Sequence, residues 1–202
     1  MNPDETSRVS HTLSWLLRHG ANESGLAMDA AGWAAIDDVL RVVGVSREAL
    51  DAVVRDNNKS RYELRGEMIR ACQGHSPKGT PVTLEALEAS WSVDPRVEPV
   101  WHGTRLAAVP AIAVEGLIPG ERTHVHLAEA TDSKVGKRAN VDVLLCVDPA
   151  RLRAAGVTLY QSPNGVILAR AVPPGCITDL RAETRKARAE EQRLRDLFRA
   201  SG

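Results

Sequence analysis

Apolar positions recur at helical spacing in the first part of the chain. Within residues 6–19 they fall three or four positions apart, which predicts a helix that ends at Gly20. A second apolar series within 33–43 predicts a helix closed by Gly44. Ser46 is a favourable N-cap for a third helix, which we expect directly after it.

A β-hairpin is predicted next. The short runs Tyr62–Leu64 and Met68–Ala71 are separated only by the tripeptide Arg-Gly-Glu, and glycine in such a short connection favours a hairpin. Three helices followed by a hairpin are typical of a winged-helix domain. We therefore expect residues 1–76 to form a winged-helix lobe.

Short apolar runs alternate with helical segments in residues 100–180, which predicts a second lobe. The pattern predicts strands at 100–102, 125–127, 141–147, 158–161, 166–170 and near Ile177, and helices at 106–115, 131–137 and 149–155. Asn164-Gly165 between two apolar runs predicts a further hairpin. The expected fold class is α+β.

Two segments lack a core of their own. Residues 77–99 are rich in proline and are expected to link the two lobes, with a short helix at 83–89. Residues 181–202 are rich in charge and have few large apolar side chains, so we expect an exposed helical tail. The predicted organisation is two lobes, a linker and a tail.

The charge balance limits how this chain can recognise a polyanion. It contains 26 basic and 26 acidic side chains, and neither predicted lobe has an excess of basic ones. A protein that binds nucleic acid through a broad positive field is therefore disfavoured. Recognition of phosphate would have to depend on individually placed arginines.

The cysteine content and the lengths of the apolar runs indicate the cellular compartment in which we expect the protein. Cys72, Cys146 and Cys176 form neither a disulfide framework nor a zinc motif, so we expect a reducing, cytoplasmic setting and no metal. No apolar run approaches the length of a membrane span, and the polar N-terminal residues do not resemble a signal peptide. Nothing in the sequence suggests more than a monomer.

Two segments of the first lobe are candidates for chemistry, and each also has a structural explanation. Arg18-His19 lies at a predicted helix C-terminus, where cations stabilise the helix dipole, but the pair could instead bind an oxyanion. Arg70 precedes the loop 73–76 (QGHS), which is either a turn after a strand or a set of donors for a phosphate or ribose.

The second lobe contributes histidines near strand ends. His102 ends a predicted strand, and alternation along 122–127 places Arg122, His124 and His126 on one face. Histidines at this spacing could ligate a metal, but a satisfied polar residue is the commoner explanation. The segment 162–166 (SPNGV) is also explained as a simple turn. No Rossmann, P-loop or G-x-S-x-G motif is present.

Seven segments occur in order between residues 10 and 177: LSWLLRHG, GWAAIDDVL, KSRYELRGEMIRACQGHS, WHGT, GLIPGERTHVHLA, VLLCVD and SPNGVILA. Together they resemble the RNA 2′-phosphotransferase family, whose best-known members act in tRNA splicing. The resemblance implies a winged-helix lobe followed by an ADP-ribosyltransferase-like lobe that binds NAD. It implies an enzyme that removes an internal 2′-phosphate from RNA and releases nicotinamide and ADP-ribose 1″,2″-cyclic phosphate.

The resemblance also implies roles for individual residues. The catalytic set would be Arg18, His19, Arg70 and Arg122, with Arg138 as the alternative to Arg122. Arg138, Gln73 and His75 would contact the RNA substrate. The residues implied to bind NAD are His102, Gly103, Thr104, His126, Ser162, Asn164 and Val166.

Two other functions remain open from the sequence. An ADP-ribosyltransferase that stops after the first step and caps nucleic-acid 5′-phosphate ends would need nearly the same site. A non-catalytic winged-helix module that binds nucleic acid is the other alternative, although the first lobe lacks the excess of positive charge that such modules usually have.

Overall fold

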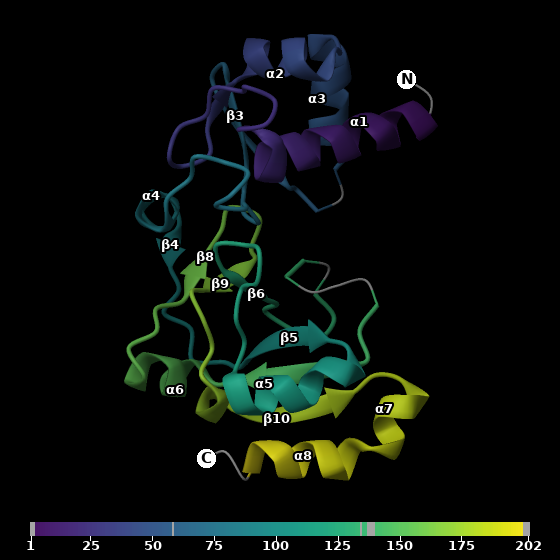
Figure 1. The fold of residues 1–202 in the computed structure, drawn as a ribbon, viewed down its shortest axis with the longest axis vertical. Coiled ribbons are helices and arrows are strands. Elements are labelled where there is room, and N and C mark those ends of the chain that lie inside the picture. The colour runs from purple at the N-terminus through teal and green to yellow at the C-terminus, as the bar shows by residue number, and fades with distance from the viewer. Residues whose placement is uncertain (1–2, 58, 134, 137–139, 200–202) are drawn as a thin grey trace. The chain divides into compact units, whose positions relative to one another are not determined.

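The protein is α+β, as the sequence predicts, and divides into two compact units (Figure 1). Unit 1 contains residues 1–91 and 121–123, and unit 2 contains residues 92–120 and 124–202. The computed structural model describes residues 3–57, 59–133, 135–136 and 140–199. In that part of the chain, no helix is both long and apolar enough to cross a membrane.

The helices of unit 1 follow the apolar pattern. α2 (Ile36–Val43) and α3 (Arg47–Arg55) confirm two predictions. α1 (Pro3–Trp15) continues directly into a π-helical turn, Leu16–Gly20, so the helical segment ends at Gly20 as expected. The chain stays helical in backbone conformation beyond that residue.

The three residues expected to cap or end helices do different things. Gly44 ends α2 in the left-handed conformation, with φ of +73°, and the Ser46 side chain accepts a hydrogen bond from the backbone N–H of Ala49. A Cβ atom at Gly20 would lie within 2.6 Å of the Trp15 ring at two positions. Glycine is needed there for close packing and not as a cap.

A three-stranded antiparallel sheet completes unit 1. β2 (Tyr62–Arg65) and β3 (Met68–Ala71) form the predicted hairpin, with Gly66 at a φ of +55° in the turn. β1 (Ala34–Ala35) pairs with the other side of β3, which gives the order β1-β3-β2. Pairing in β2–β3 sets Glu63 opposite Arg70.

Apolar side chains from the helices and the sheet form one core in unit 1. Fully buried members include Leu13, Leu17, Leu50 and Ile69. The short helix predicted at 83–89 is confirmed as α4 (Leu84–Ala89).

Unit 2 contains two antiparallel sheets. One has the order β10-β7-β5, with β10 at Ile177–Ala182, β7 at Val143–Val147 and β5 at Val100–Thr104. The other has the order β4-β8-β9-β6, with β4 at Ser92–Val93, β8 at Tyr160–Gln161, β9 at Ile167–Ala169 and β6 at Val125–Leu127. Gly165, with a φ of +79°, turns β8 into β9 and confirms the predicted hairpin.

The described residues of unit 2 also form the α-helices α5 (Val109–Glu115), α6 (Pro149–Ala154), α7 (Arg185–Ala189) and α8 (Glu191–Arg199). α8 packs against β10 and α5, as Figure 1 shows. Leu194 of α8 is buried in the same core as Leu145 and Leu152. The predicted tail is therefore only partly exposed, because its apolar face completes the core.

Two local predictions are wrong in unit 2. The described residues of the helix expected at 131–137 form turns and bends, while Lys134 and Lys137 lie outside the described residues. The strand expected over 122–127 begins only at Val125. Arg122 and His124 therefore precede the strand, and alternation does not determine where their side chains lie.

Candidate active site

Arg18 and His19 lie on the π-helical turn Leu16–Gly20. A π-turn widens the helix locally and is often found at functional sites. The side chains of Leu16 and Leu17 are buried, which anchors the turn in the core of unit 1. The sequence predicted this pair at a helix end, and the structure places it at the irregular turn that follows α1.

A loop after β3 holds the backbone of this turn. The N–H of Ser76 donates to the carbonyl oxygen of Arg18 over 2.8 Å, and the N–H of Asn22 donates to the carbonyl oxygen of Gly79 over 3.0 Å. The Cα of Gly79 lies so close that an added Cβ would be 1.8 Å from the carbonyl oxygen of His19. The loop therefore positions both candidate residues through main-chain interactions.

The Arg18 side chain is partly buried, and the described chain satisfies only part of its guanidinium. Its Nε and Nη2 atoms are buried and make no hydrogen bond to any residue that the structure describes. Burial, followed by the charges of nearby groups that include Arg61 and Arg122, lowers the pKa of Arg18 to about 10. Buried polar groups are almost always hydrogen-bonded, so a missing anionic partner is the simplest explanation of this arrangement.

Arg61 and Arg122 are the other cations near Arg18. Arg61 directly precedes β2, and its Nη1 donates to Asn57 Oδ1 over 3.2 Å. Arg122 belongs to the segment 121–123, which is tied to unit 1 by a 3.0 Å hydrogen bond from the N–H of Thr123 to the carbonyl oxygen of His75. The structure thus brings Arg18, His19 and Arg122 together and adds Arg61, which the sequence analysis missed. In the sequence, only the position of Arg61 inside the segment KSRYEL indicated a role for it.

The charge of this cluster affects His19. Partial burial lowers the pKa of His19 below its ordinary value of 6.5, and the positive charges of Arg18 and Arg122 lower it further. The imidazole is therefore mostly neutral at pH 7, with one nitrogen able to donate a hydrogen bond and the other able to accept a proton.

Replacing Arg122 with alanine is expected to raise the pKa of His19, because a neighbouring positive charge that disfavours the imidazolium is removed. An NMR titration of the histidine ring resonances measures this, with His19→Asn used to assign the signal. Arg41→Ala, which removes an arginine paired with Asp38, is the control and should leave the His19 titration unchanged. An unaltered pKa of His19 in Arg122→Ala would contradict the placement of Arg122 near His19.

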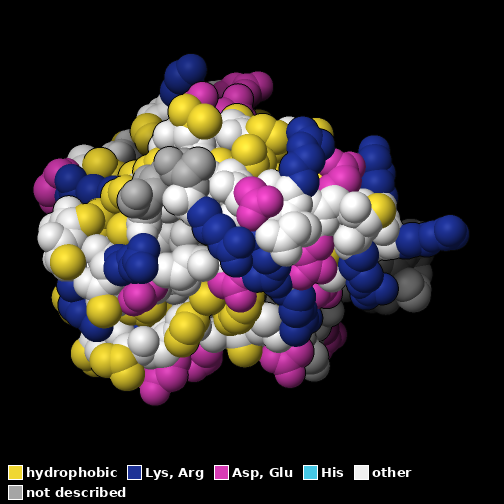
Figure 2. Space-filling model, turned by 90° about the horizontal axis from the view of Figure 1, so that it is seen from below, with side chains coloured by type: hydrophobic (Ala, Val, Ile, Leu, Met, Phe, Trp, Pro, Cys, Tyr) yellow, Lys and Arg dark blue, Asp and Glu magenta, His cyan; other side chains and the backbone are white. Residues whose placement is uncertain are grey.

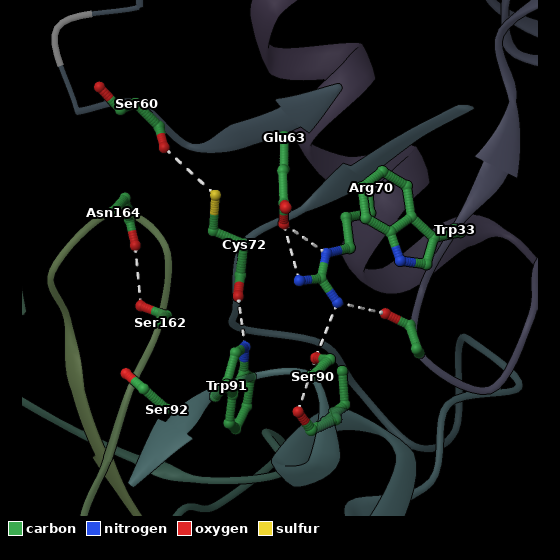
Figure 3. Close-up of polar contacts among 12 residues, drawn as sticks. Trp33, Ser60, Glu63, Arg70, Cys72, Ser90, Trp91, Ser92, Ser162 and Asn164 are labelled. Carbon is green, nitrogen blue, oxygen red and sulfur yellow. Dashed lines mark hydrogen bonds and ion pairs between the residues drawn. The ribbon is translucent and has the colours of Figure 1, made fainter. Parts of the chain in front are cut away.

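Arg70 has a different environment from Arg18. Its Nε and Nη2 both lie 2.7 Å from Glu63 Oε2, and its Nη1 donates to Ser90 Oγ over 2.7 Å. Its guanidinium also lies over the Trp33 ring, 4.6 Å from the centroid (Figure 3). The side chain is buried and its donors are used within unit 1. The catalytic role of Arg70 stays a prediction, while its interactions indicate a structural role.

The other candidates from the loop after β3 are also buried. Gln73 is 8% exposed and His75 is fully buried. His75 packs against Gly32, where an added Cβ would lie 2.7 Å from its Nε2. Their contact with RNA stays a prediction, and Arg138 lies outside the described residues.

The candidate NAD-binding residues lie in unit 2 on β5, β6 and the β8–β9 turn. His102 Nδ1 is 3.0 Å from the carbonyl oxygen of His126. Because a carbonyl oxygen only accepts, Nδ1 carries the proton in this hydrogen bond. This hydrogen bond brings two of the predicted residues together.

The remaining NAD-binding candidates lie on β5 or at the turn between β8 and β9. Gly103 and Thr104 continue β5, and Thr104 is 6% exposed. Ser162 Oγ lies 2.9 Å from Asn164 Oδ1 and 3.1 Å from the carbonyl oxygen of Val166, so the turn orders its own polar groups. Val166 is buried. Their contact with NAD stays a prediction.

The structure does not support a nucleophilic cysteine, either among the candidates of unit 1 or among those of unit 2. Burial raises the pKa of the Cys72 thiol to about 11, and burial likewise raises the pKa values of Cys146 and Cys176. Thiols with raised pKa values are poor nucleophiles at neutral pH. Among the described residues, no group of three or more His, Cys, Asp or Glu side chains is placed to hold a metal ion.

Comparison with known proteins identifies the family. The model of the RNA 2′-phosphotransferase, Tpt1/KptA family matches residues 4–171. A "Probable RNA 2′-phosphotransferase" of Pseudomonas syringae pv. tomato is 37% identical over 183 residues, which cover 86% of this chain and 94% of the relative. A protein of the same name from Burkholderia lata is 39% identical over 180 residues, covering 85% and 89%. With most of its length matched in this way, the chain belongs to the RNA 2′-phosphotransferase family.

Proposed function

We propose that this protein is an NAD-dependent RNA 2′-phosphotransferase that removes an internal 2′-phosphate in two steps. The observation that carries the proposal is the buried guanidinium of Arg18, with two nitrogens unpartnered within the described chain, in a cluster with Arg61, Arg122 and His19. Such a cluster suits a dianionic phosphate, because guanidinium groups bind phosphate oxygens bidentately. The proposal includes a winged-helix lobe within unit 1 and an ADP-ribosyltransferase-like lobe within unit 2.

In the first step, the RNA 2′-phosphate attacks the anomeric carbon of the nicotinamide ribose of NAD, and nicotinamide leaves. The nucleophile is already an anion at neutral pH, so no strong base is needed. The arginines hold its oxygens in a fixed orientation, which lowers the entropic part of the barrier. A buried, uncharged Val166 is compatible with this step, since the substrate itself supplies the negative charge.

In the second step, the 2″-hydroxyl of the ADP-ribose attacks the phosphorus and displaces the RNA 2′-oxygen. Charge moves onto the equatorial oxygens of phosphorus, where preorganised cations stabilise the transition state most. His19, mostly neutral because its pKa is lowered, is suited to accept the proton of the attacking hydroxyl. The protonated His19 then returns this proton to the leaving 2′-oxygen, so the products are RNA with a free 2′-hydroxyl and ADP-ribose 1″,2″-cyclic phosphate.

The polar groups of unit 2 suit the ribose of NAD. His102 Nδ1 donates to the carbonyl oxygen of His126, which orients the ring beside the predicted ribose position. The buried hydroxyls of Thr104 and Ser162 provide further polar groups on neighbouring segments. NAD supplies the electrophilic carbon, and these residues would bind and orient it.

Incubation with an RNA oligonucleotide that carries one radiolabelled internal 2′-phosphate tests the proposal. We expect the label to leave the RNA only when NAD is present, also in excess EDTA, and to appear in ADP-ribose cyclic phosphate. A stable ADP-ribosyl adduct on RNA would instead favour the capping transferase. RNA binding without turnover would favour the non-catalytic module.

Arg61 and Arg70 form a matched pair of variants for the same assay. Arg61→Ala is expected to lower kcat/KM by about 100-fold or more with unchanged thermal stability. Arg70→Ala is expected to lower the free energy of unfolding by about 3 kcal/mol, because it leaves Glu63 without its buried partner. If Arg70→Ala instead melts like the wild type and is inactive, Arg70 belongs to the phosphate site as the family resemblance implies.

A further inference from the structure

A groove of about 350 Å³ lies between β10, α6 and α8 in unit 2. Its polar lining includes Arg151, Arg195 and Arg199 together with Thr178 and Asp179. All of these residues except Arg151 lie beyond residue 171, where the family match ends. The groove is therefore mostly built from a part of the chain that the family resemblance does not explain.

The arginines of the groove have spare hydrogen-bond donors. Three guanidinium groups and the Asp179 carboxylate line the groove, and the arginines also pair with Asp148, Glu191 and Asp196. Among the described residues, Arg199 reaches an acid only through Nη1, 3.3 Å from Asp196 Oδ1, and its side chain is 72% exposed. Arg151 uses Nε and Nη1 for Asp148 and the carbonyl oxygen of Gly175, respectively. Each arginine has five N–H donors, so both retain donors for an anion.

An aromatic side chain lies beside these cations. Phe198 lines the groove and packs with its other side against the core of unit 2. An aromatic ring held by a core next to guanidinium groups is the combination that binds a nucleobase and its phosphate in single-stranded nucleic acid. The volume is within the range of pockets for small ligands, roughly 300–1,000 Å³, and suits one nucleotide.

The surrounding surface carries charges of both signs. Figure 2, which views the molecule from below, shows lysine and arginine side chains interspersed with acidic ones on this face. Of the seven basic side chains in residues 181–202, six are arginines. Arginine binds phosphate in a fork and stacks on bases, whereas lysine is a hydrated point charge. These features favour RNA over an acidic peptide, which offers no bases to stack.

We propose that this groove binds one nucleotide of a single-stranded segment of RNA, with the phosphate held by Arg151 and Arg199 and the base against Phe198. The choice of RNA rests on the proposed function, while the groove itself does not include any residue assigned to the reaction. It would hold a part of the substrate outside the 2′-phosphate site and so affect the KM for long RNA more than kcat.

Fluorescence anisotropy with a labelled single-stranded RNA 12-mer that lacks a 2′-phosphate, without NAD, tests the groove with the full chain. We expect the double variant Arg151→Ala/Arg199→Ala to weaken binding about tenfold. The salt-dependence slope should fall by about 0.7 for each phosphate that is no longer neutralised by an arginine. Phe198→Leu keeps an apolar side chain against the core and is expected to weaken binding about fivefold.

Arg193→Ala is the matched control. Arg193 lies on the same helix, is 70% exposed and pairs with Glu190 three residues earlier, as Arg199 pairs with Asp196, but it does not line the groove. Its variant should bind RNA within twofold of the wild type, and circular dichroism melting should show that all variants fold. Equal weakening by Arg193→Ala, or no weakening by the double variant, would overturn the proposal. Displacement of RNA by an equally charged poly-glutamate would also do so.

The two proposals fail separately. If the chain releases the 2′-phosphate label but the groove variants bind RNA normally, the groove proposal fails and the proposed function stands. If no label is released but the groove variants weaken binding of unmodified RNA, the proposed reaction fails and the RNA groove stands.

Discussion

Replacing Arg18 with methionine is expected to abolish 2′-phosphate transfer and, at the same time, to make the protein more stable. The activity should fall by about 1,000-fold or more, because a preorganised cation at the phosphate is removed. The stability should rise because the guanidinium is buried and has two nitrogens without partners in the described chain. Methionine fills a similar space without a charge.

The size of the gain follows from the lowered pKa. Burial lowers the pKa of Arg18 to about 10, and this lowering corresponds to about 3 kcal/mol at 1.36 kcal/mol per pKa unit. A cation whose pKa is lower in the folded state destabilises the fold at every pH below that value, and the cost disappears only as the pH rises above about 10. We expect Arg18→Met to gain about 1–3 kcal/mol at pH 7.

Urea unfolding at pH 7 measures this gain, alongside the radiolabel assay. Arg61→Met is the control, because Arg61 is hydrogen-bonded to Asn57 and its removal should lower activity without raising stability. A lower stability of Arg18→Met would show that the guanidinium has a structural partner, and the case for an anion-binding site would fail.

Replacing Gly79 with alanine is expected to reduce both stability and activity, although Gly79 has no side chain of its own. The new Cβ would meet the carbonyl oxygen of His19 at 1.8 Å, and two backbone segments must then separate. Overpacking of this kind costs about 1–3 kcal/mol. A displacement of about 1 Å at Arg18 and His19 should lower kcat about 100-fold.

Gly175→Ala is the matched control for this substitution. Both glycines have backbone conformations open to other residues, but a Cβ at Gly175 would meet no atom within 4 Å. Thermal melting and kcat should therefore be unchanged in Gly175→Ala. If Gly79→Ala also behaves like the wild type, the loop after β3 does not hold the Arg18–His19 turn.

The local sequence predicted the structure correctly where a single residue determines the end of a helix or the conformation of a turn. Gly44 and Ser46 set helix ends through their own conformation and side chain, and the turns at Gly66 and Gly165 need a positive φ that glycine adopts easily. Gly20 also ends its helical segment as expected, but without a left-handed cap. Its role depends on the Trp15 ring five residues earlier, and helix-stop rules do not include such packing.

The candidate site was only partly predictable for a related reason. Arg18 and His19 lie in a segment shared with the family motifs, and the structure places them near Arg122. The sequence analysis named Arg70, which lies within β3, and missed Arg61, which directly precedes β2. Pairing of β2 with β3 puts Glu63 opposite Arg70, which neutralises one arginine and leaves the other near Arg18.

The apolar pattern, the capping residues and the ordered motifs were enough to identify the α+β class, most helices and strands, and the family. These features depend on neighbours within a few residues, and such short-range preferences can be recognised in the chain alone. Which buried cation is left unsatisfied within the described chain, and which loop holds the Arg18–His19 turn, followed only from packing between residues far apart in the sequence. Burial and charge pairing are properties of that packing, and they set the pKa values on which the proposed chemistry depends.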